Sequence, residues 1–344
     1  MRKKLPTIRE VAEAAGVSIS TVSNVLYGKR GFYAPETAQR VWTAVEQLGY
    51  RPNHIARSLA RRHTFTIGVV AEQLLGNVSH NLYFGVVLDG ILQGATDRDY
   101  QVKIVRVPAS AYEKAFGHIE DGSVEGAILL ALPASNPIIE RMEQSNIPSV
   151  VAGSIPPSSK LPCVDVEDIG ATYQAVRWLI SLGHRRIGII TGNLNYWSAR
   201  RREQGYLMAL REAGIEPHPA WRYEGNFSLA AGEAGALQLL RAEPPPTAIV
   251  CGNDRMAMGV LHALQRQGVK VPEQISVLGF DDEETATLTS PPLTTLRQPM
   301  FEIGLKAAEL LLQQIELGKR LQHTLLLPAE LVVRETVAPP PPDQ

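Results

Sequence analysis

Small polar side chains recur along residues 18–24, where they alternate with aliphatic ones. At about 100° per residue of a helix, Ser20 and Asn24 lie on the face opposite Val22. An asparagine amide can pair with both hydrogen-bonding atoms of an adenine edge, and a serine hydroxyl can bond a base or a phosphate. Ile19 could contact a thymine methyl group. This segment therefore has the chemistry of a helix that reads DNA bases.

The sequence around that segment predicts a helix-turn-helix. Thr7 and Glu10 are spaced as a capping box at the start of a first helix that Gly16 ends. Ser18 can cap a second helix two residues later, and a third is expected to start at Pro35. Two short helices joined by a tight glycine turn, with a third behind them, place the second helix in the major groove.

The charge distribution supports this interpretation. Residues 1–62 carry 11 Lys and Arg against 4 Asp and Glu, a balance of +7, whereas the rest of the chain has a balance of −8. A basic head on an acidic body is typical of a nucleic-acid-binding module joined to a module of another kind.

The body of the chain predicts an α/β fold. Short apolar runs alternate with helical patterns from about residue 66 to residue 279, which indicates parallel sheets covered by helices on both faces. The series is interrupted near residues 154–162, so we expect two doubly wound parallel-sheet lobes behind a small all-α head. Ligands of such sheets bind at the carboxyl ends of the strands, which places a site in the cleft between the lobes.

Other function classes lack their sequence signals. The glycine-rich phosphate loops, the H-E-x-x-H pattern and the G-x-S-x-G pattern are missing, and the eight histidines have no metal-ligand spacing. We therefore expect no enzyme, no metal and no cofactor. No run reaches about 18 apolar residues and the N-terminus has no apolar signal core, so we expect a cytoplasmic protein without membrane contact. Cys163 and Cys251 are expected to be small buried hydrophobic residues.

Residues 7–26, TIREVAEAAGVSISTVSNVL, resemble the head of the lactose-repressor/galactose-repressor family of bacterial regulators. The resemblance implies base contacts by Ile19, Ser20 and Asn24. It also implies phosphate contacts by the hydroxyl groups of Thr7, Ser18, Thr21 and Ser23. Some members have Arg where this chain has Asn24, so its operator sequence is expected to differ from theirs. Ala34 replaces the usual Ser or Thr before the third helix, at a cost of roughly 1 kcal/mol.

Residues 51–62 resemble the hinge of the same family, with a plain charged linker as the alternative. The segment is too short to be a stable helix by itself. The resemblance implies a helix that forms when two copies meet in the minor groove, through contacts by Ile55, Ala56 and Leu59. Leu59 would wedge between base pairs there and kink the duplex. The implied partners are a second copy of the chain, as a homodimer, and a near-palindromic double-stranded DNA operator.

Motifs of the body resemble the same family, whose two lobes are similar to periplasmic binding proteins. They include GHRRIG from Gly183, CGNDRMAMG from Cys251 and VLGFDD from Val277. The resemblance implies three crossings between lobes, which we place near residues 160, 291 and 322. The expected domains are then a head (1–50), a hinge (51–62), a body (63–338) and a Pro-rich tail (339–344). Within the body, we expect lobe 1 to comprise 63–160 and 292–322, and lobe 2 to comprise 161–291 and 323–338.

The candidate effector site combines position and resemblance. Asp281 and Asn253 each follow a predicted strand, where a carboxylate can accept two sugar hydroxyls and an amide can both donate and accept. The resemblance adds Arg202 as a ligand-holding arginine and Phe227 as an aromatic that packs on the ligand. It also implies effector contacts by Gln298, Tyr83, Phe84 and Trp197.

Each of these residues also has a plainer interpretation. Asp281 could be a capping or turn residue, Arg202 part of a solvated run, and Phe227 and Trp197 ordinary core aromatics. Hydroxyl-binding groups beside aromatic faces suit a small-molecule effector that is a sugar or sugar derivative, in a repressor whose operator affinity the ligand sets. A purine or phosphosugar co-repressor, or a partner protein, is the alternative. A transport receptor would need a signal peptide and would lack the DNA-binding head.

Overall fold

The computed structural model describes residues 6–26, 28, 31–51, 63–72, 82–107 and 112–342. Its contacts divide the chain into two units, 1–64 and 65–344, and each unit is described here by itself.

The first unit contains the three predicted helices, α1 (Ile8–Ala15), α2 (Ile19–Leu26) and α3 (Pro35–Leu48). The capping box of α1 is present, because the Thr7 side chain accepts from the Glu10 backbone N–H and the Glu10 side chain accepts from that of Thr7. No side chain caps α3 at Ala34, as expected. The helices enclose a small aliphatic core made by Val11, Ala12, Ala15, Val22, Val25, Val41 and Ala44.

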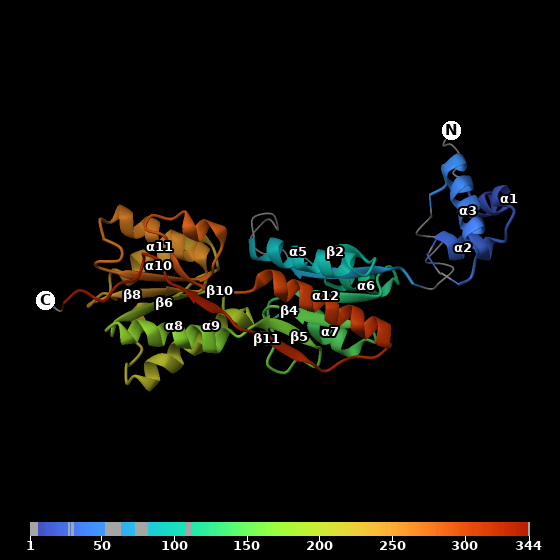
Figure 1. Cartoon of the computed structure of the whole chain (residues 1–344). Coiled ribbons are helices and arrows are strands. Elements are labelled where there is room, and N and C mark those ends of the chain that lie inside the picture. Colours follow the sequence, from blue (N-terminus) through green and yellow to red (C-terminus); the bar gives the residue numbers. More distant parts are fainter. Residues whose placement is uncertain are drawn as a thin grey trace. The chain divides into compact units, whose positions relative to one another are not determined.

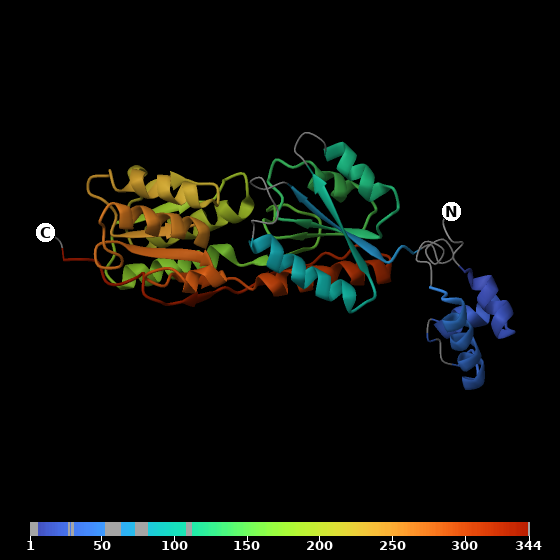
Figure 2. The same cartoon turned by 90° about the horizontal axis from the view of Figure 1, so that it is seen from above.

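The second unit contains two six-stranded sheets, one in each lobe (Figures 1 and 2). In lobe 1 the strand order is β11-β5-β4-β3-β1-β2, and all neighbours are parallel. Its strands are β1 (Thr66–Glu72), β2 (Gln101–Val107), β3 (Gly126–Leu130), β4 (Ser149–Ala152), β5 (Cys163–Val166) and β11 (Thr324–Leu327). Its helices are α5 (Leu82–Thr96), α6 (Tyr112–Glu120), α7 (Ile138–Gln144) and α12 (Met300–Leu317).

In lobe 2 the strand order is β12-β10-β9-β8-β6-β7, and all neighbours are parallel except β12, which runs antiparallel to β10. Its strands are β6 (Ile187–Thr191), β7 (Arg222–Glu224), β8 (Ala248–Cys251), β9 (Ser276–Asp281), β10 (Thr294–Arg297) and β12 (Glu330–Val332). Its helices are α8 (Asp168–Ser181), α9 (Trp197–Glu212), α10 (Leu229–Leu239) and α11 (Asp254–Arg266), with 3-10 turns at Pro219–Trp221 and Glu284–Thr287. The central strands β6, β8 and β9 are buried along their whole length, as the apolar runs predicted, whereas the edge strands β7 and β12 are exposed or half-buried.

The crossings between lobes lie about seven residues later than predicted. They fall between β5 and α8, between β10 and α12, and between β11 and β12. The predicted boundaries at 160, 291 and 322 therefore assigned β5, β10 and β11 to the wrong lobes. The last two strands, β11 and β12, follow each other closely in the chain but belong to different sheets. The reason is that each crossing follows the carboxyl end of a strand, and these short strands were not predicted as separate elements.

Helices α5 and α12 lie side by side on one face of the lobe 1 sheet, where glycines allow a very close approach (Figures 1 and 2). A Cβ on Gly90 of α5 would lie 2.0 Å from the Phe301 carbonyl oxygen. A Cβ on Gly304 of α12 would lie 1.9 Å from the Val87 carbonyl oxygen. The two backbones are therefore in direct contact, and neither glycine can be replaced without moving a helix.

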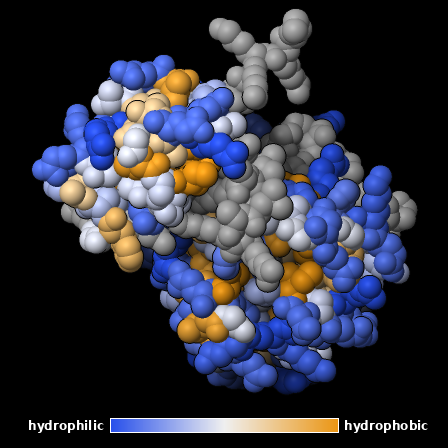
Figure 3. Space-filling model, turned by 90° about the vertical axis from the view of Figure 1, so that its right-hand side faces the viewer, coloured by the Kyte–Doolittle hydropathy of each residue, from blue (hydrophilic) through white to orange (hydrophobic). Residues whose placement is uncertain are grey.

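The part of the surface shown in Figure 3 is mostly polar, with apolar residues in small groups. In the head, Phe32 and Trp42 are exposed aromatic residues. Among the described residues, no helix combines the length and the apolar character that a membrane crossing requires.

Candidate functional site

The exposed face of α2 carries the residues predicted to read bases. The side chain of Ile19 is 44% exposed, Ser20 is exposed and Asn24 is half-buried. Ser18 caps the helix by accepting from the Thr21 backbone N–H at 3.1 Å. The Ser18 hydroxyl also lies 2.7 Å from the Ser20 hydroxyl. The cap orients the first turn of α2, so that its small polar groups stand beside Ile19 at the surface.

The predicted phosphate contacts lie at the N-terminal ends of the first two helices and within the second. Thr7 is exposed at the start of α1, and Ser18 is exposed at the start of α2. Thr21 and Ser23 are half-buried, and the Thr21 hydroxyl lies 2.9 Å from that of Ser18. The predicted minor-groove residues, Ile55, Ala56 and Leu59, lie outside the described residues.

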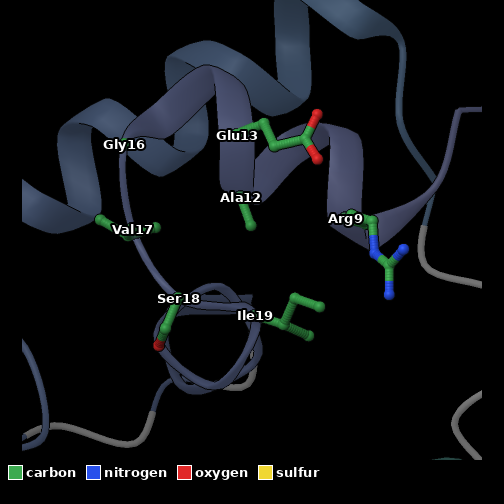
Figure 4. A pocket seen from close by; sticks show the side chains of 7 residues that line it. All are labelled: Arg9, Ala12, Glu13, Gly16, Val17, Ser18 and Ile19. Carbon is green, nitrogen blue, oxygen red and sulfur yellow. The ribbon is translucent and has the colours of Figure 1, made fainter.

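A hollow of about 560 Å³ opens between α1 and the start of α2 (Figure 4). The Arg9 and Ile19 side chains extend into the same space, with Glu13 and Ser18 at its margin. Arg9 places an exposed guanidinium next to the base-reading face, where it suits a phosphate or a base edge. Sequence reasoning missed Arg9, although its position opposite the buried face of α1 was a usable signal.

The body contains a buried polar cluster centred on Arg202, which lies in the second turn of α9. Its Nε donates to the Asp168 carboxylate at 2.7 Å, and its Nη1 donates to the Gly252 carbonyl at 2.6 Å. The same Nη1 lies 3.8 Å from an Asp281 oxygen. The guanidinium also stacks over the Phe280 ring, 3.5 Å from its centre. Arg202 is therefore a buried, paired charge and not part of a solvated run.

Asp281 ends β9 in a left-handed conformation, with φ 126°. Its carboxylate accepts from Gln298 Nε2 at 2.5 Å and faces Arg202. Burial raises the pKa of Asp281 well above its usual range, while Arg202 acts in the opposite direction. The Oε1 atom of Gln298 is buried and has no hydrogen-bond partner among the described residues. Three predicted residues, Arg202, Asp281 and Gln298, thus meet where β10 passes into α12.

Phe227 and Asn253 form a neighbouring pair. Asn253 caps α11 by accepting from the Met256 backbone N–H at 3.0 Å, and its amide donates to the Phe227 carbonyl at 3.3 Å. The Phe227 ring lies against Gly192, where a Cβ would come within 2.0 Å of it. The ring also meets Tyr196 edge to face, with 6.0 Å between centres. Asn253 therefore has a structural role that accounts for both of its polar groups.

The two candidate effector residues of lobe 1, Tyr83 and Phe84, have different surroundings. Tyr83 lies at the start of α5 with its hydroxyl over Gly153, where a Cβ would lie 2.3 Å away. Burial and then the Asp165 carboxylate raise the pKa of Tyr83, so this hydroxyl is close to the acidic cluster. Phe84 instead packs into the lobe 1 core and is 5% exposed. Its position is that of an ordinary core aromatic.

Trp197 begins α9 at the rim between the lobes. Its backbone N–H donates to the Ser154 hydroxyl at 3.0 Å, and its ring lies under the Arg200 guanidinium, 4.6 Å away. Next to it, the Asn195 carbonyl accepts from the Ala134 N–H, and the Asn195 amide donates to the Ser135 hydroxyl at 2.8 Å. These contacts join a loop of lobe 2 to two loops of lobe 1, and we refer to them as the rim contacts.

Sequence reasoning missed two acidic residues of the cluster, Asp165 on β5 and Asp168 at the start of α8. Both are buried, with exposed fractions of 2% and 1%. The signal available was a pair of carboxylates on either side of a strand end, which is the position that had singled out Asp281. Cys163 and Cys251 are both buried, as expected.

A helix-turn-helix head and a pair of parallel-sheet lobes with a buried polar cluster at their crossings define a DNA-binding regulator with a ligand-binding body. The family model "Bacterial regulatory proteins, lacI family" matches residues 7–53, and the model "Periplasmic binding protein-like domain" matches residues 176–337.

Similar proteins cover nearly the whole chain. The HTH-type transcriptional repressor PurR of Vibrio campbellii is 35% identical over 337 residues, which is 97% of this chain and 99% of the relative. The ribose operon repressor of Haemophilus influenzae is 35% identical over 348 residues, again 97% and 99%. The structure of the lac repressor dimer bound to operator and the anti-inducer ONPF has a TM-score of 0.86 at 29% identity, covering 97% of this chain and 100% of the other. A transcriptional regulator CelR-cellobiose complex has a TM-score of 0.76 at 30% identity, covering 96% and 99%.

The chain therefore belongs to the lacI family of bacterial regulatory proteins. It is a DNA-binding transcriptional repressor whose activity is regulated by a small molecule, and it is not an enzyme. The predicted family, fold class and general function are confirmed.

Proposed function

We propose that two copies of the chain bind a near-palindromic operator and that a sugar or sugar derivative between the lobes sets their affinity for it. The observation that carries the ligand proposal is the Arg202–Asp281–Gln298 cluster at the carboxyl ends of the lobe 2 strands. Its groups are held in place by hydrogen bonds from separate elements, α9, β9 and the crossing into α12. Such a fixed set of donors and acceptors suits a molecule with several hydroxyl groups.

The aromatic groups beside this cluster support the same class of ligand. Phe227 and Tyr196 form an apolar wall against which the face of a sugar ring can pack. Two of the similar proteins point the same way, since one is named a ribose operon repressor and the other is a complex with cellobiose.

A purine or phosphosugar co-repressor is the second candidate, because a planar base could also pack against these rings. Relatives named PurR are as similar to this chain as the ribose operon repressor is. A regulating partner protein is the remaining alternative for the same body.

For the DNA, we infer that Ile19, Ser20 and Asn24 contact base edges, while Thr7, Ser18, Thr21 and Ser23 contact phosphates. Arg9 joins this set because it shares the hollow beside Ile19. We further infer that the hinges of the dimer fold in the minor groove, with Leu59 as the wedge. The ligand shifts operator affinity only by its difference in affinity for the two arrangements of the lobes.

A melting-temperature screen of the purified full-length protein tests the ligand class. A ligand at about 100 times its Kd should add about 2.7 kcal/mol to the free energy of unfolding. We expect stabilisation by a sugar or sugar derivative. Stabilisation by purines or phosphosugars alone would favour the second candidate. If sugars, purines and phosphosugars all leave the melting temperature unchanged, a ligand of either kind is contradicted.

The Asp281→Ala substitution tests the role of the cluster. Because it removes the acceptor that faces Arg202 and Gln298, we expect loss of the ligand response with operator affinity unchanged, measured by fluorescence anisotropy of labelled operator with and without ligand. A folded variant that no longer binds operator, or that still responds normally to ligand, would contradict this role.

A further inference from the structure

Asp165 is a buried carboxylate that forms no ion pair with any of the described residues. It lies on β5, next to the crossing into lobe 2, and is 2% exposed. One of its oxygens accepts from the Val166 backbone N–H at 2.8 Å, whereas Oδ2 has no hydrogen-bond partner among the described residues. A buried carboxylate oxygen without a hydrogen bond destabilises the folded state unless a bound donor or a positive charge pairs with it.

The nearby arginine is already engaged. Three buried carboxyl groups, those of Asp165, Asp168 and Asp281, act electrostatically on Arg202, which bonds Asp168 at 2.7 Å and lies 3.8 Å from Asp281. The half-buried Arg201 also acts on Asp165, but no ion pair between them is present among the described residues. The cluster therefore carries more acidic groups than its buried arginine can balance.

A second observation points to a ligand and not to a structural role. Gln298 Oε1, which is held beside Asp281 by the bond from Nε2, is buried and unpartnered. Asp168 Oδ2 and the Thr172 hydroxyl are also buried and unpartnered, and Thr172 borders a cavity of about 10 Å³ beside Arg202. When the carboxyl groups are ionised, three of these four atoms, those of Asp165, Asp168 and Gln298, can only accept, so the missing partner is a donor.

We propose that the ligand of this site carries a protonated amine, as an amino sugar or another amine-bearing polyol does, and that Asp165 pairs with it. This inference rests on the proposed function and specifies the chemical class of the effector. The ammonium group supplies positive charge and three donors, which are what the cluster lacks. The hydroxyl groups of the same ligand would bind to Arg202, Asp281 and Gln298.

The raised pKa of Asp165 is consistent with an ammonium group taking the place of its proton. Burial, and then the charge of Asp168, raise the pKa of Asp165 to about 7. A carboxyl group that releases its proton near neutrality can replace it with an ammonium group. Affinity for the amine should therefore fall as the pH drops below about 7. The other titratable or charged groups that face Asp165 are Asp168, Arg202, Arg201 and the hydroxyl of Tyr83.

Matched pairs of probes test the proposal on the full-length protein. D-glucosamine, D-galactosamine and D-mannosamine are compared with D-glucose, D-galactose and D-mannose, first by melting-temperature shift and then by titration calorimetry. We expect at least one amine to bind about tenfold more tightly than its neutral counterpart, which is the value of about one partly screened charge pair. The Asp165→Asn variant should lose this preference and should melt higher than the wild type at pH 8.

The Asp254→Asn variant is the matched control. Asp254 is also buried with a pKa of about 7, but both of its oxygens are bonded, to the Thr295 hydroxyl at 2.5 Å and to the Glu283 N–H at 2.9 Å. It should keep the ratio between amine and neutral affinities.

Each outcome is decisive. Equal affinity within every pair, an unchanged ratio in Asp165→Asn, or no binding of any amine would overturn the cationic class. Binding of a neutral sugar in the same screen would leave the proposed function intact, so the two failures are distinguishable.

Discussion

Arg202 shows how much one side chain can organise in a buried site. Its guanidinium reaches Asp168, Gly252 and Asp281 from one position on α9 and stacks on Phe280. A lysine ammonium has neither the planar fork nor the flat face for these contacts. Burial, and after it the neighbouring acidic groups, raises the pKa values of Asp165 and Asp281, while Arg202 acts in the opposite direction.

Burial of another carboxyl group, that of Asp254, predicts an unusual pH dependence of stability. The pKa of Asp254 is about 7 in the folded chain and about 3.9 in an unfolded one, so between these pH values only the folded state holds the proton. The stability that this proton contributes is present at low pH and is lost as the pH rises through about 7. The Asp254→Asn variant should lose that pH dependence, which amounts to on the order of a few kcal/mol.

Calorimetric melting of both proteins from pH 4 to pH 8 checks this, since the difference between them isolates Asp254 from His184, whose buried ring has a lowered pKa. Parallel curves for the two proteins would contradict the assignment.

At the scale of elements, the α5–α12 pair of lobe 1 packs backbone against backbone at two glycines. The sequence does not predict this contact, because glycines inside helices are locally unfavourable and say nothing about a partner. Only the packed structure shows that Gly90 and Gly304 face backbone atoms. The short strand β5 was missed for a related reason, since Asp165 interrupts its apolar run and only pairing with β4 and β11 makes it a strand.

The Gly304→Ala substitution should destabilise the body by on the order of 1–3 kcal/mol, because the added Cβ would lie 1.9 Å from the Val87 carbonyl oxygen. The Gly85→Ala substitution on α5 is the control, since nothing lies within 4 Å of its Cβ. It should be neutral or stabilising by up to about 1 kcal/mol. Thermal unfolding of both variants measures this, and equal effects would exclude the backbone contact as the cause.

At the scale of the whole body, the rim contacts join the two lobes within the described part of the chain. Asn195 of lobe 2 bonds Ala134 and Ser135 of lobe 1, and the Trp197 N–H bonds Ser154. If ligand binds preferentially when these contacts are made, they form part of the equilibrium that links ligand to operator.

Removing one rim contact should therefore weaken ligand binding without touching the buried cluster. The Asn195→Ala and Ser135→Ala variants each lose the bond at 2.8 Å. Each should lower ligand affinity by about fivefold, the value of about 1 kcal/mol. In a double-mutant cycle by calorimetry the two effects should not add. Additive effects, or unchanged affinity, would show that the rim does not bias the lobes.

The sequence by itself determined the elements whose signals are local. The three helices of the head, their caps and the outward face of α2 follow from spacing, because helix periodicity and capping act within a few residues. The alternating pattern likewise predicted a two-lobed parallel fold, and it placed Asp281 at a strand end.

The tertiary structure alone decided which distant residues share a site. Asp165, Asp168 and Arg202 come from separate elements, and their unmatched charge exists only because burial removes water from all three. It also separated Phe84, which lies in the core, from Tyr83, which faces the cluster. The points where the chain crosses between lobes depend on strand pairing, and pairing is a long-range property that residue spacing does not encode.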